Sequence, residues 1–393
     1  MAVYCLELPN GGGHVRDLLD RARAETGLQD FGDDAFLEGL EILTAALRSE
    51  ARLNARGEAY IYPRIVGHLS QRLQVEDWYA RHPEIDEVPV AEPLFGLGLP
   101  RTGSTALSFL LAQDPGIRYL RSWESATPCP PPSTVVGVDP RIPRDTPKVL
   151  AGSRSHVPVD ARGPMECLDL MALDFKSQIF QAFAQIPTYS QWLVERADFT
   201  STYRYQRRVL ALLAWGEPVR PWRLKTPAHV LSLTYLDEVF PDARFVMTHR
   251  DPSDVLLSVA DVYADIVGGF TDHLDRRYLG ELNVAQWATG TQRVCRFRAG
   301  PAGARFFDID FTAMAADPLG EVRRLYAWLG RPVSDEFEAG MAHWWAQNAA
   351  DREPHPKADP ADFGMDFDAI RPLFAEYLAL SADWTKSGES HGN

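Results

Sequence analysis

Apolar and polar residues alternate at helical spacing through the first part of the chain, residues 15–80. Asp33 or Asp34 stands before the first apolar run and can cap a helix there. A second amphipathic run covers residues 58–79. The pattern therefore predicts a helical N-terminal extension over residues 1–90. The first run is defined by Leu37, Leu40, Leu43 and Leu47.

Shorter apolar runs follow beyond residue 90. Residues 93–99, PLFGLGL, read as a strand, and residues 104–113, STALSFLLAQ, read as the helix after it. WRLKTP at 222–227 and ARFVMTHRDP at 243–252 read as further strands, each stopped by a proline turn. EVRRLYAWLG at 321–330 reads as a helix that ends at its glycine. Strands that alternate with helices in this order predict a parallel sheet with helices on both faces.

The expected architecture is one α/β domain of the P-loop type, with three layers and a central parallel sheet, over residues 91–335. Residues 336–393 are expected to form a C-terminal extension that packs on the same domain. Residues 164–215 read as helical and rich in aromatic side chains. Residues 127–147 are too dense in proline for regular structure. They form either an ordered segment beside the site or a surface connection.

The composition is that of an ordinary globular protein, with 45% hydrophobic and 24% charged residues among 393. No apolar run reaches the roughly 18 residues of a membrane span, and the N-terminus does not resemble a secretory signal. The four cysteines form no C-x-x-C pair, and no His, Asp and Glu cluster has metal-ligand spacing. We therefore expect a cytoplasmic protein without a metal site. The formal net charge of −14 argues against nucleic acid as a partner.

The sequence from Gly98, GLPRTGST, has the glycine spacing of a phosphate-binding loop between a strand and a helix. Its two glycines permit a tight turn, and the backbone N–H groups of residues 102–106 can point at one anion. A nucleoside triphosphatase has a lysine where this chain has Ser104, and that lysine neutralises the β- and γ-phosphates. Without this lysine the loop suits a single phosphate, to which the guanidinium of Arg101 can donate two hydrogen bonds. The candidate ligand-binding residues are Arg101, Thr102, Gly103, Ser104, Thr105 and Ala106.

Two other interpretations of this loop explain less of it. A plain glycine turn can join a strand to a helix, but it does not require Arg101, Ser104 and Thr105 in the same turn. A dinucleotide-binding fingerprint needs a third glycine where this chain has Arg101. Anion binding is therefore the interpretation that we favour.

The predicted strand in ARFVMTHRDP (243–252) has an arginine, Arg250, at its carboxyl end. Asp251 can cap the next helix, and Ser258 lies inside that helix. Because ligands of open parallel sheets bind at the carboxyl ends of the strands, Arg250 and Ser258 can form a second, separate phosphate site. Taken alone, Arg250 could instead pair with Asp251 or Asp254 at the surface.

The two anchors together resemble the sulfotransferases that use 3′-phosphoadenosine 5′-phosphosulfate (PAPS), in particular their bacterial branch. The resemblance rests on PRTGST after the first strand and on Arg-x7-Ser in the later strand–helix unit, and it covers about residues 90–335. It implies that residues 101–105 hold the 5′-phosphosulfate and that Arg250 with Ser258 holds the 3′-phosphate. Since PAPS has no γ-phosphate, the resemblance also explains the missing lysine. Three more segments are similar to the family: RLKTPAH (223–229), FDIDFTAMAADP (307–318) and HPKADPADFGMD (355–366).

The chain departs from the family's pattern at four places. The family commonly has lysine at the position of Arg101 and tryptophan near Leu107. Phe311 stands where a tyrosine is usual, and the chain has no clear Arg-Lys-Gly loop for the 3′-phosphate, for which Lys357 is the candidate. The positive charge of the loop is the same as in the family, because arginine replaces lysine. The sequence does not identify the residue that would stack on adenine.

Sulfuryl transfer needs a base that takes the proton of the acceptor, and histidine suits this role near neutral pH. In LKTPAH, Thr226 can cap and Pro227 can open a helix, which places His229 in its first turn near the strand ends. In the family a histidine directly follows the Lys-Thr pair, where this chain has Pro227. His229 is therefore either the base or a buried histidine bonded to the backbone.

Glu166, in GPMECLDL before a predicted helix, is the alternative base, or else an acidic residue of a first helical turn. A carboxylate base needs a pKa raised by burial. His156 in SRSHVP is a third candidate. Lys225 is expected to neutralise charge on the leaving 5′-phosphate, unless it is a surface lysine at a strand end. The catalytic candidates are thus His229, Glu166 and Lys225.

These features indicate a sulfotransferase that moves a sulfuryl group from PAPS to a hydroxyl or amine of a small molecule and releases 3′,5′-bisphosphoadenosine (PAP). The alternatives are a P-loop kinase or nucleotidase of related fold, which would need magnesium, and a non-catalytic nucleotide-binding protein. The aromatic segment 164–215 favours an apolar or phenolic acceptor, and a sterol, lipid or carbohydrate hydroxyl stays open. A homo-oligomer is compatible with the sequence.

Overall fold

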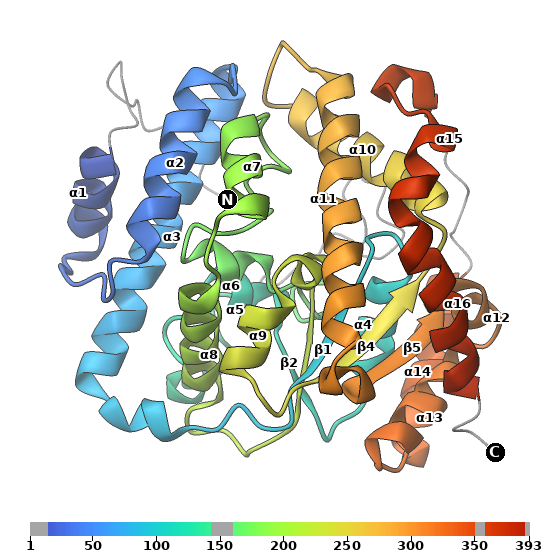
Figure 1. Cartoon of the computed structure of the whole chain (residues 1–393). Coiled ribbons are helices and arrows are strands. Elements are labelled where there is room, and N and C mark those ends of the chain that lie inside the picture. Colours follow the sequence, from blue (N-terminus) through green and yellow to red (C-terminus); the bar gives the residue numbers. More distant parts are fainter. Residues whose placement is uncertain (1–14, 143–159, 350–357, 390–393) are drawn as a thin grey trace.

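The protein is described from a computed structural model, which covers residues 15–142, 160–349 and 358–389 (Figure 1). Its centre is a five-stranded sheet with the strand order β2-β3-β1-β4-β5. Every neighbouring pair of strands is parallel, which confirms the predicted sheet. The strands are β1 (Leu94–Gly98), β2 (Arg118–Tyr119), β3 (Trp222–Lys225), β4 (Arg244–His249) and β5 (Phe306–Asp310).

Apolar side chains alternate between the two faces of the sheet. In β4, Phe245 and Met247 belong to one core cluster, and Val246 between them belongs to another. Because successive side chains of a strand point to opposite faces, both faces need a layer of helices. The cluster around Val246 is covered by α4 (Ser104–Leu111), α13 (Pro318–Leu329) and α14 (Asp335–Ala349). The larger cluster is covered by α8 (Thr200–Ala214), α9 (Leu233–Val239), α10 (Pro252–Gly268) and α11 (Arg276–Arg298).

Within the described residues, three α-helices precede β1 and confirm the helical prediction for residues 15–80. Three of the four predicted leucines are buried, and Leu37 packs on the core from a partly buried position. Asp33 accepts a hydrogen bond from the N–H of Ala35, 2.6 Å away, one residue before the helix begins. The extension boundaries at residues 90 and 335 stay predictions. These helices are α1 (Val15–Thr26), α2 (Phe36–Ser49) and α3 (Ala55–Arg81).

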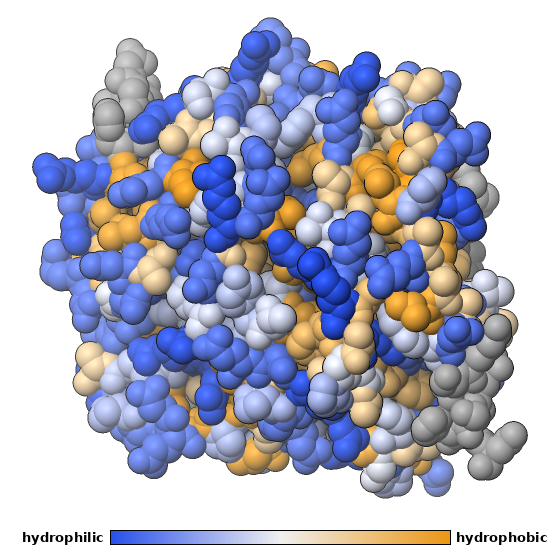
Figure 2. Space-filling model, in the orientation of Figure 1, coloured by the Kyte–Doolittle hydropathy of each residue, from blue (hydrophilic) through white to orange (hydrophobic). Residues whose placement is uncertain are grey.

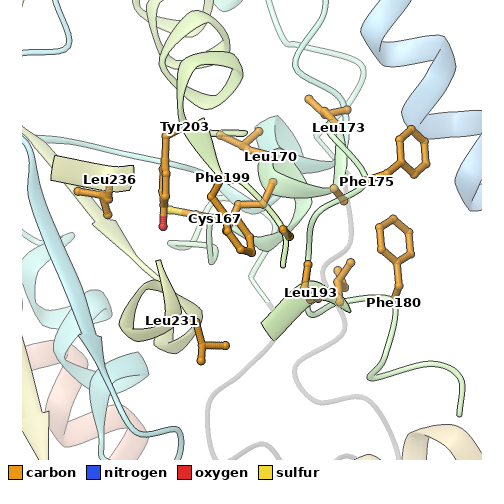
Figure 3. Close-up of a cluster of buried hydrophobic side chains, with 14 of the residues drawn as sticks. Cys167, Leu170, Leu173, Phe175, Phe180, Leu193, Phe199, Tyr203, Leu231 and Leu236 are labelled. Atoms are coloured by element: carbon orange, nitrogen blue, oxygen red, sulfur yellow. The ribbon is translucent and has the colours of Figure 1, made fainter. Parts of the chain in front are cut away.

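The aromatic side chains of residues 164–215 turn inward. Figure 3 shows Phe175, Phe180, Phe199 and Tyr203 near buried leucines of the same cluster, and each of the four is at most 4% exposed. The aromatic composition of this segment therefore reflects packing, and it does not support an apolar or phenolic acceptor as the sequence suggested. The segment forms α6 (Leu168–Ala172), α7 (Pro187–Glu195) and α8.

The proline-rich segment is described as far as residue 142. Up to that point its regular structure consists of one short 3-10 helix, η2 (Pro132–Thr134), as its composition predicted. Residues 143–147 lie outside the described part. The remaining elements are η1 (Pro83–Glu87), α5 (Ser122–Ala126), η3 (Pro227–Leu231), η4 (Pro301–Arg305), α12 (Phe311–Ala316), η5 (Pro360–Phe363), α15 (Phe367–Ile370), η6 (Arg371–Phe374) and α16 (Ala375–Glu389).

Hydrophilic residues predominate on the face of the molecule in Figure 2, where apolar residues form separate patches. The two longest described helices, α3 and α11, have 27 and 23 residues and carry charged side chains along their length. Across the described residues, no helix combines the length and the apolar character that crossing a bilayer requires.

Candidate functional site

The loop between β1 and α4 has the shape of an anion site. Gly98 has a φ of +130°, and a Cβ there would lie 2.5 Å from the carbonyl oxygen of Thr248 in β4. Gly103, with a φ of +85°, is the N-cap of α4 and has no side chain with which to cap the helix. The first N–H groups of α4 thus point to the carboxyl edge of the sheet, and Gly103 provides no side chain to accept their hydrogen bonds. These N–H groups can therefore donate to a bound anion. We call residues 98–105 the phosphate loop.

Thr102 fastens the phosphate loop to the neighbouring strand. Its hydroxyl donates to the carbonyl of Leu99 over 2.7 Å and lies 2.6 Å from the hydroxyl of Thr248. The residue is fully buried. Its side chain therefore holds the loop in place, and only its backbone N–H suits a ligand.

Arg101, Arg250 and Ser258, predicted from separate motifs, meet beside the phosphate loop. The Nε of Arg101 donates to the Ser258 hydroxyl over 3.2 Å, and the Nη1 of Arg250 donates to the carbonyl of Arg101 over 3.1 Å. The Arg250 guanidinium lies over the ring of Phe311, 4.3 Å from its centroid. Arg101 has a φ of 62°, which a residue other than glycine adopts only when its surroundings hold it. We call Arg101, Arg250 and Ser258 the arginine cluster.

The surface pairing that competes for Arg250 is present only in part. Its Nε lies 3.8 Å from the carboxylate of Asp254. Asp251 instead caps α10 by accepting from the N–H of Ser253, and it pairs with Arg371. The Arg250 side chain is 29% exposed, so a ligand can reach its guanidinium.

Lys225, the last residue of β3, links the phosphate loop to Glu166. Its Nζ donates to the hydroxyl of Thr105 over 3.1 Å and to Oε1 of Glu166 over 2.6 Å. The Thr226 hydroxyl donates to Oε2 of the same carboxylate over 3.2 Å. Lys225 is buried, whereas the Glu166 side chain is 30% exposed. A held and accessible carboxylate therefore stands beside the anion site.

Asp169 adds a second carboxylate near Glu166. It is buried and pairs with Arg64 of α3. Burial raises the pKa of Asp169, the charge of Arg64 lowers it, and the charge of Glu166 raises it further, so that the pKa lies above its ordinary value. The sequence pattern did not single out Asp169, although its spacing of three residues from Glu166, at the start of a helix, was the available signal.

His229 lies apart from these groups, in the core. It is fully buried, its Nδ1 is 2.8 Å from the hydroxyl of Tyr203, and its ring packs edge-on against Phe95. Its Nε2 has no partner among the described residues. Burial lowers the pKa of His229 to about 3. A base must reach the proton that it abstracts, so this buried position argues against His229 as the base.

The other predicted residues fall into two groups. Ser104 and Ala106 lie in the first turn of α4, and Ser104 is buried. His156 and Lys357 lie outside the described residues. In the part of the chain that the structure describes, no group of three or more His, Cys, Asp and Glu residues could hold a metal ion.

A model of the sulfotransferase family matches residues 93–335. This is more than half of the chain, and it includes the phosphate loop, Glu166, Lys225 and the arginine cluster. The chain belongs to the sulfotransferase family. No curated protein matches its sequence significantly.

Two solved structures support the same conclusion for this sulfotransferase. Sulfotransferase STF9 from Mycobacterium avium is 31% identical, with a TM-score of 0.86, and the match covers 95% of this chain and 98% of that one. Sulfotransferase STF1 from Mycobacterium tuberculosis is 29% identical, with a TM-score of 0.79, and the match covers 92% of this chain and 98% of that one. The similarity therefore extends over the helices at both ends as well as the sheet.

The electrostatics of the sulfotransferase differ between the whole chain and the site. The chain carries a formal net charge of −14, yet Arg101, Lys225 and Arg250 all lie at the carboxyl edge of the sheet. Together with the N-terminus of α4 they make a local cationic region. An anionic ligand can bind there, next to the carboxylate of Glu166.

Proposed function

We propose that this sulfotransferase moves a sulfuryl group from PAPS to a hydroxyl or amine of a small-molecule acceptor. The observation that carries the proposal is the position of Lys225, whose ammonium group contacts the phosphate loop through Thr105 and the carboxylate of Glu166 at once. A single cation thus lies between a site for the leaving phosphate and a group that can act as the base.

The donor has one phosphate at each end of its ribose, and two cationic groups suit them. Arg101 and the N–H groups of residues 102–106 would hold the 5′-phosphosulfate. Arg250 with Ser258 would hold the 3′-phosphate. In the structure Arg101 donates to Ser258, so a bound phosphate oxygen would take over hydrogen bonds that these side chains now make with each other.

Glu166 is the base that we propose in place of His229. As the acceptor oxygen attacks sulfur, its proton passes to the Glu166 carboxylate, a bond forms between the acceptor oxygen and sulfur, and the bond from sulfur to the 5′-phosphate oxygen breaks. Lys225 can then stabilise the negative charge that develops on the leaving phosphate. Its ammonium group already donates to Thr105, in the loop that would hold that phosphate. In-line placement of the three reacting atoms would supply much of the remaining acceleration.

Calorimetric titration with PAP and with Mg-ATP, followed by a mass-spectrometric screen of hydroxyl and amine acceptors with PAPS, tests this proposal. We expect PAP to bind more tightly than Mg-ATP and at least one acceptor to gain the mass of a sulfuryl group. Tight binding of Mg-ATP without PAP binding would instead favour a P-loop kinase or nucleotidase. PAP binding without transfer to any acceptor would favour a non-catalytic nucleotide-binding protein.

A further inference from the structure

The turn that carries Arg250 is held from both sides by the C-terminal segment of the chain. Arg250 is flanked by His249, the last residue of β4, and by Asp251, the N-cap of α10. His249 contacts Tyr377 of α16, and Asp251 contacts Arg371 of η6. Figure 1 shows α16 running beside α11 and over β5, at the edge of the sheet next to β4.

The ring of His249 is fixed at both of its nitrogens. Its Nε2 lies 2.7 Å from Oδ1 of Asp308 in β5, and its Nδ1 lies 3.0 Å from the hydroxyl of Tyr377. Although burial alone would raise the pKa of Asp308, hydrogen bonds from Arg298 and His249 bring it below its ordinary value. Because Asp308 is thus an acceptor, Nε2 donates to it, which leaves Nδ1 to pair with the Tyr377 hydroxyl.

This contact is part of a buried cluster that α16 completes. Arg298, the last residue of α11, donates to both oxygens of Asp308, over 2.6 and 2.7 Å. The Arg298 guanidinium lies 3.7 Å from the ring centroid of Trp384 in α16 and 4.4 Å from that of Phe306. Since Tyr377 and His249 are 2% and 4% exposed, water does not substitute readily for these contacts.

The second contact lies at the surface and acts on the start of α10. The Nη1 of Arg371 donates to Oδ2 of Asp251 over 2.9 Å, while Oδ1 of Asp251 accepts from the N–H of Ser253. The same helix carries Ser258 of the arginine cluster. Arg371 therefore holds the residue that fixes the first turn of the helix on which the second anchor depends.

We infer that Tyr377 and Arg371 are positioning residues for the nucleotide, because they hold His249 and Asp251 on either side of Arg250 and so set where its guanidinium lies. The inference rests on the proposed function, in which Arg250 binds the 3′-phosphate. Neither residue belongs to the phosphate loop or to the arginine cluster. They hold the turn at residues 249–251 in place, and this keeps the guanidinium of Arg250 in its position.

Tyr377→Phe tests the first contact, because it keeps the ring and its packing and removes only the hydroxyl. It leaves Nδ1 of His249 buried without its hydrogen-bond partner. We expect the Kd for PAP and the KM for PAPS to rise about three- to tenfold, the range of one lost hydrogen bond, with kcat and the KM for the acceptor unchanged. The matched control is Tyr79→Phe, which removes a tyrosine hydroxyl that donates to the carbonyl of Arg208, between α3 and α8.

Arg371→Ala tests the second contact with a substitution at a 57% exposed side chain, which the fold tolerates. We expect a smaller rise in the same two constants, about two- to threefold, because exposed ion pairs contribute little. Arg371→Lys should restore most of the affinity, which a loss of packing would not explain. The matched control is Arg323→Ala, which removes an exposed ion pair with Glu338 between α13 and α14.

The outcomes separate this inference from the proposed function. If the unmodified protein does not bind PAP, the proposed function fails. If it binds PAP and both variants keep wild-type Kd and KM for the nucleotide, the positioning role is wrong while the proposed function stands. A fall in kcat alone, or an equal loss of nucleotide affinity in Tyr79→Phe and Arg323→Ala, would also overturn it.

Discussion

Two side chains close in sequence, one at the end of β3 and one in the turn after it, lie in opposite surroundings. The Nζ of Lys225 reaches the Thr105 hydroxyl and the carboxylate of Glu166 at the edge of the sheet. His229, four residues later in the sequence, packs in the core against Tyr203. Nearness to the carboxyl end of a strand therefore does not by itself bring a side chain into the site.

The 3-10 helix η3 produces this difference. Pro227 begins the turn, and the N–H of His229 donates to the carbonyl of Thr226 over 3.3 Å. The four residues after Pro227 in η3 are all buried, so the turn packs into the core beneath the strand ends. A charged imidazole would have no compensation there, which explains why burial lowers the pKa of His229.

The largest effect on turnover is expected for Glu166→Gln. The substitution keeps the size of the side chain and removes its capacity to accept a proton. We expect kcat to fall by about 10²–10⁴-fold, the usual contribution of a general base, with little change in the Kd for PAP. Steady-state rates by mass detection of the product, with calorimetry for PAP, measure the two quantities. A wild-type kcat would remove Glu166 from the chemistry.

Lys225→Met should come next. It removes the cation that we place at the leaving phosphate, and the loss of one such charge-stabilising donor costs about 10²–10³-fold in kcat. Lys225→Arg should recover part of the rate because the charge is kept. If Lys225→Met changes only the KM for the acceptor, the lysine merely holds Glu166 in place.

Arg250→Ala separates donor binding from chemistry. We expect it to weaken PAP binding by about 1.5–3 kcal/mol, the range of a hydrogen bond to a charged group. Arg244→Ala is the control, because Arg244 lies at the opposite end of the same strand and donates to the carbonyl of Trp328. Equal PAP affinities for the two variants in calorimetry would exclude Arg250 from the site.

His229→Gln should have the smallest effect on turnover, leaving kcat at its wild-type value, and should act on acid stability instead. His229 has a pKa of about 3 in the fold against 6.5 in its ordinary state, so the unfolded chain binds the additional proton between these values. The unfolding free energy should therefore fall as the pH drops below about 6.5, by about 1.4 kcal/mol per pH unit for this residue.

Urea unfolding at a series of pH values measures this loss, which should be shallower in His229→Gln. A slope should persist in that variant because burial also lowers the pKa of His68 to about 3. A large fall in kcat for His229→Gln, with Glu166→Gln unaffected, would restore His229 as the base.

The two halves of the proposed donor site could each be located from the sequence because each half is continuous. The phosphate loop and the segment from Arg250 to Ser258 are both strand–turn–helix units, in which local geometry fixes the direction of the backbone. The contact between Arg101 and Ser258 joins residues 157 positions apart, and it follows only from the pairing of β1 with β4.

The contact between the two residues of the proposed acceptor side could not be predicted in the same way. Glu166 and Lys225 are 59 positions apart, and their contact depends on the path of the chain before α6, where the N–H of Cys167 bonds to the carbonyl of Lys225. The buried or exposed state of a histidine or a carboxylate is also a property of the folded packing. The sequence therefore left His229 and Glu166 as alternatives.

Helix α11 was missed for a different reason. It buries Asn283, Gln286 and Thr291 together with its apolar residues, and the three amide and hydroxyl side chains bond within the core. Buried polar residues blur the apolar stripe by which an amphipathic helix is found. The same helix ends at Arg298, which pairs with Asp308 in the buried cluster that α16 completes.

The absent side chain of Gly98 has a consequence for ligand length. Any larger residue would place a carbon 2.5 Å from the carbonyl oxygen of Thr248 and force apart two strands whose main chains nearly touch. Arg101 leaves the first of these strands and Arg250 leaves the second. The distance between the two backbones is therefore fixed by close contact between their peptide groups. Replacing either arginine would change how strongly the site binds an anion. Binding two anions at a different separation would require a different geometry of the sheet itself.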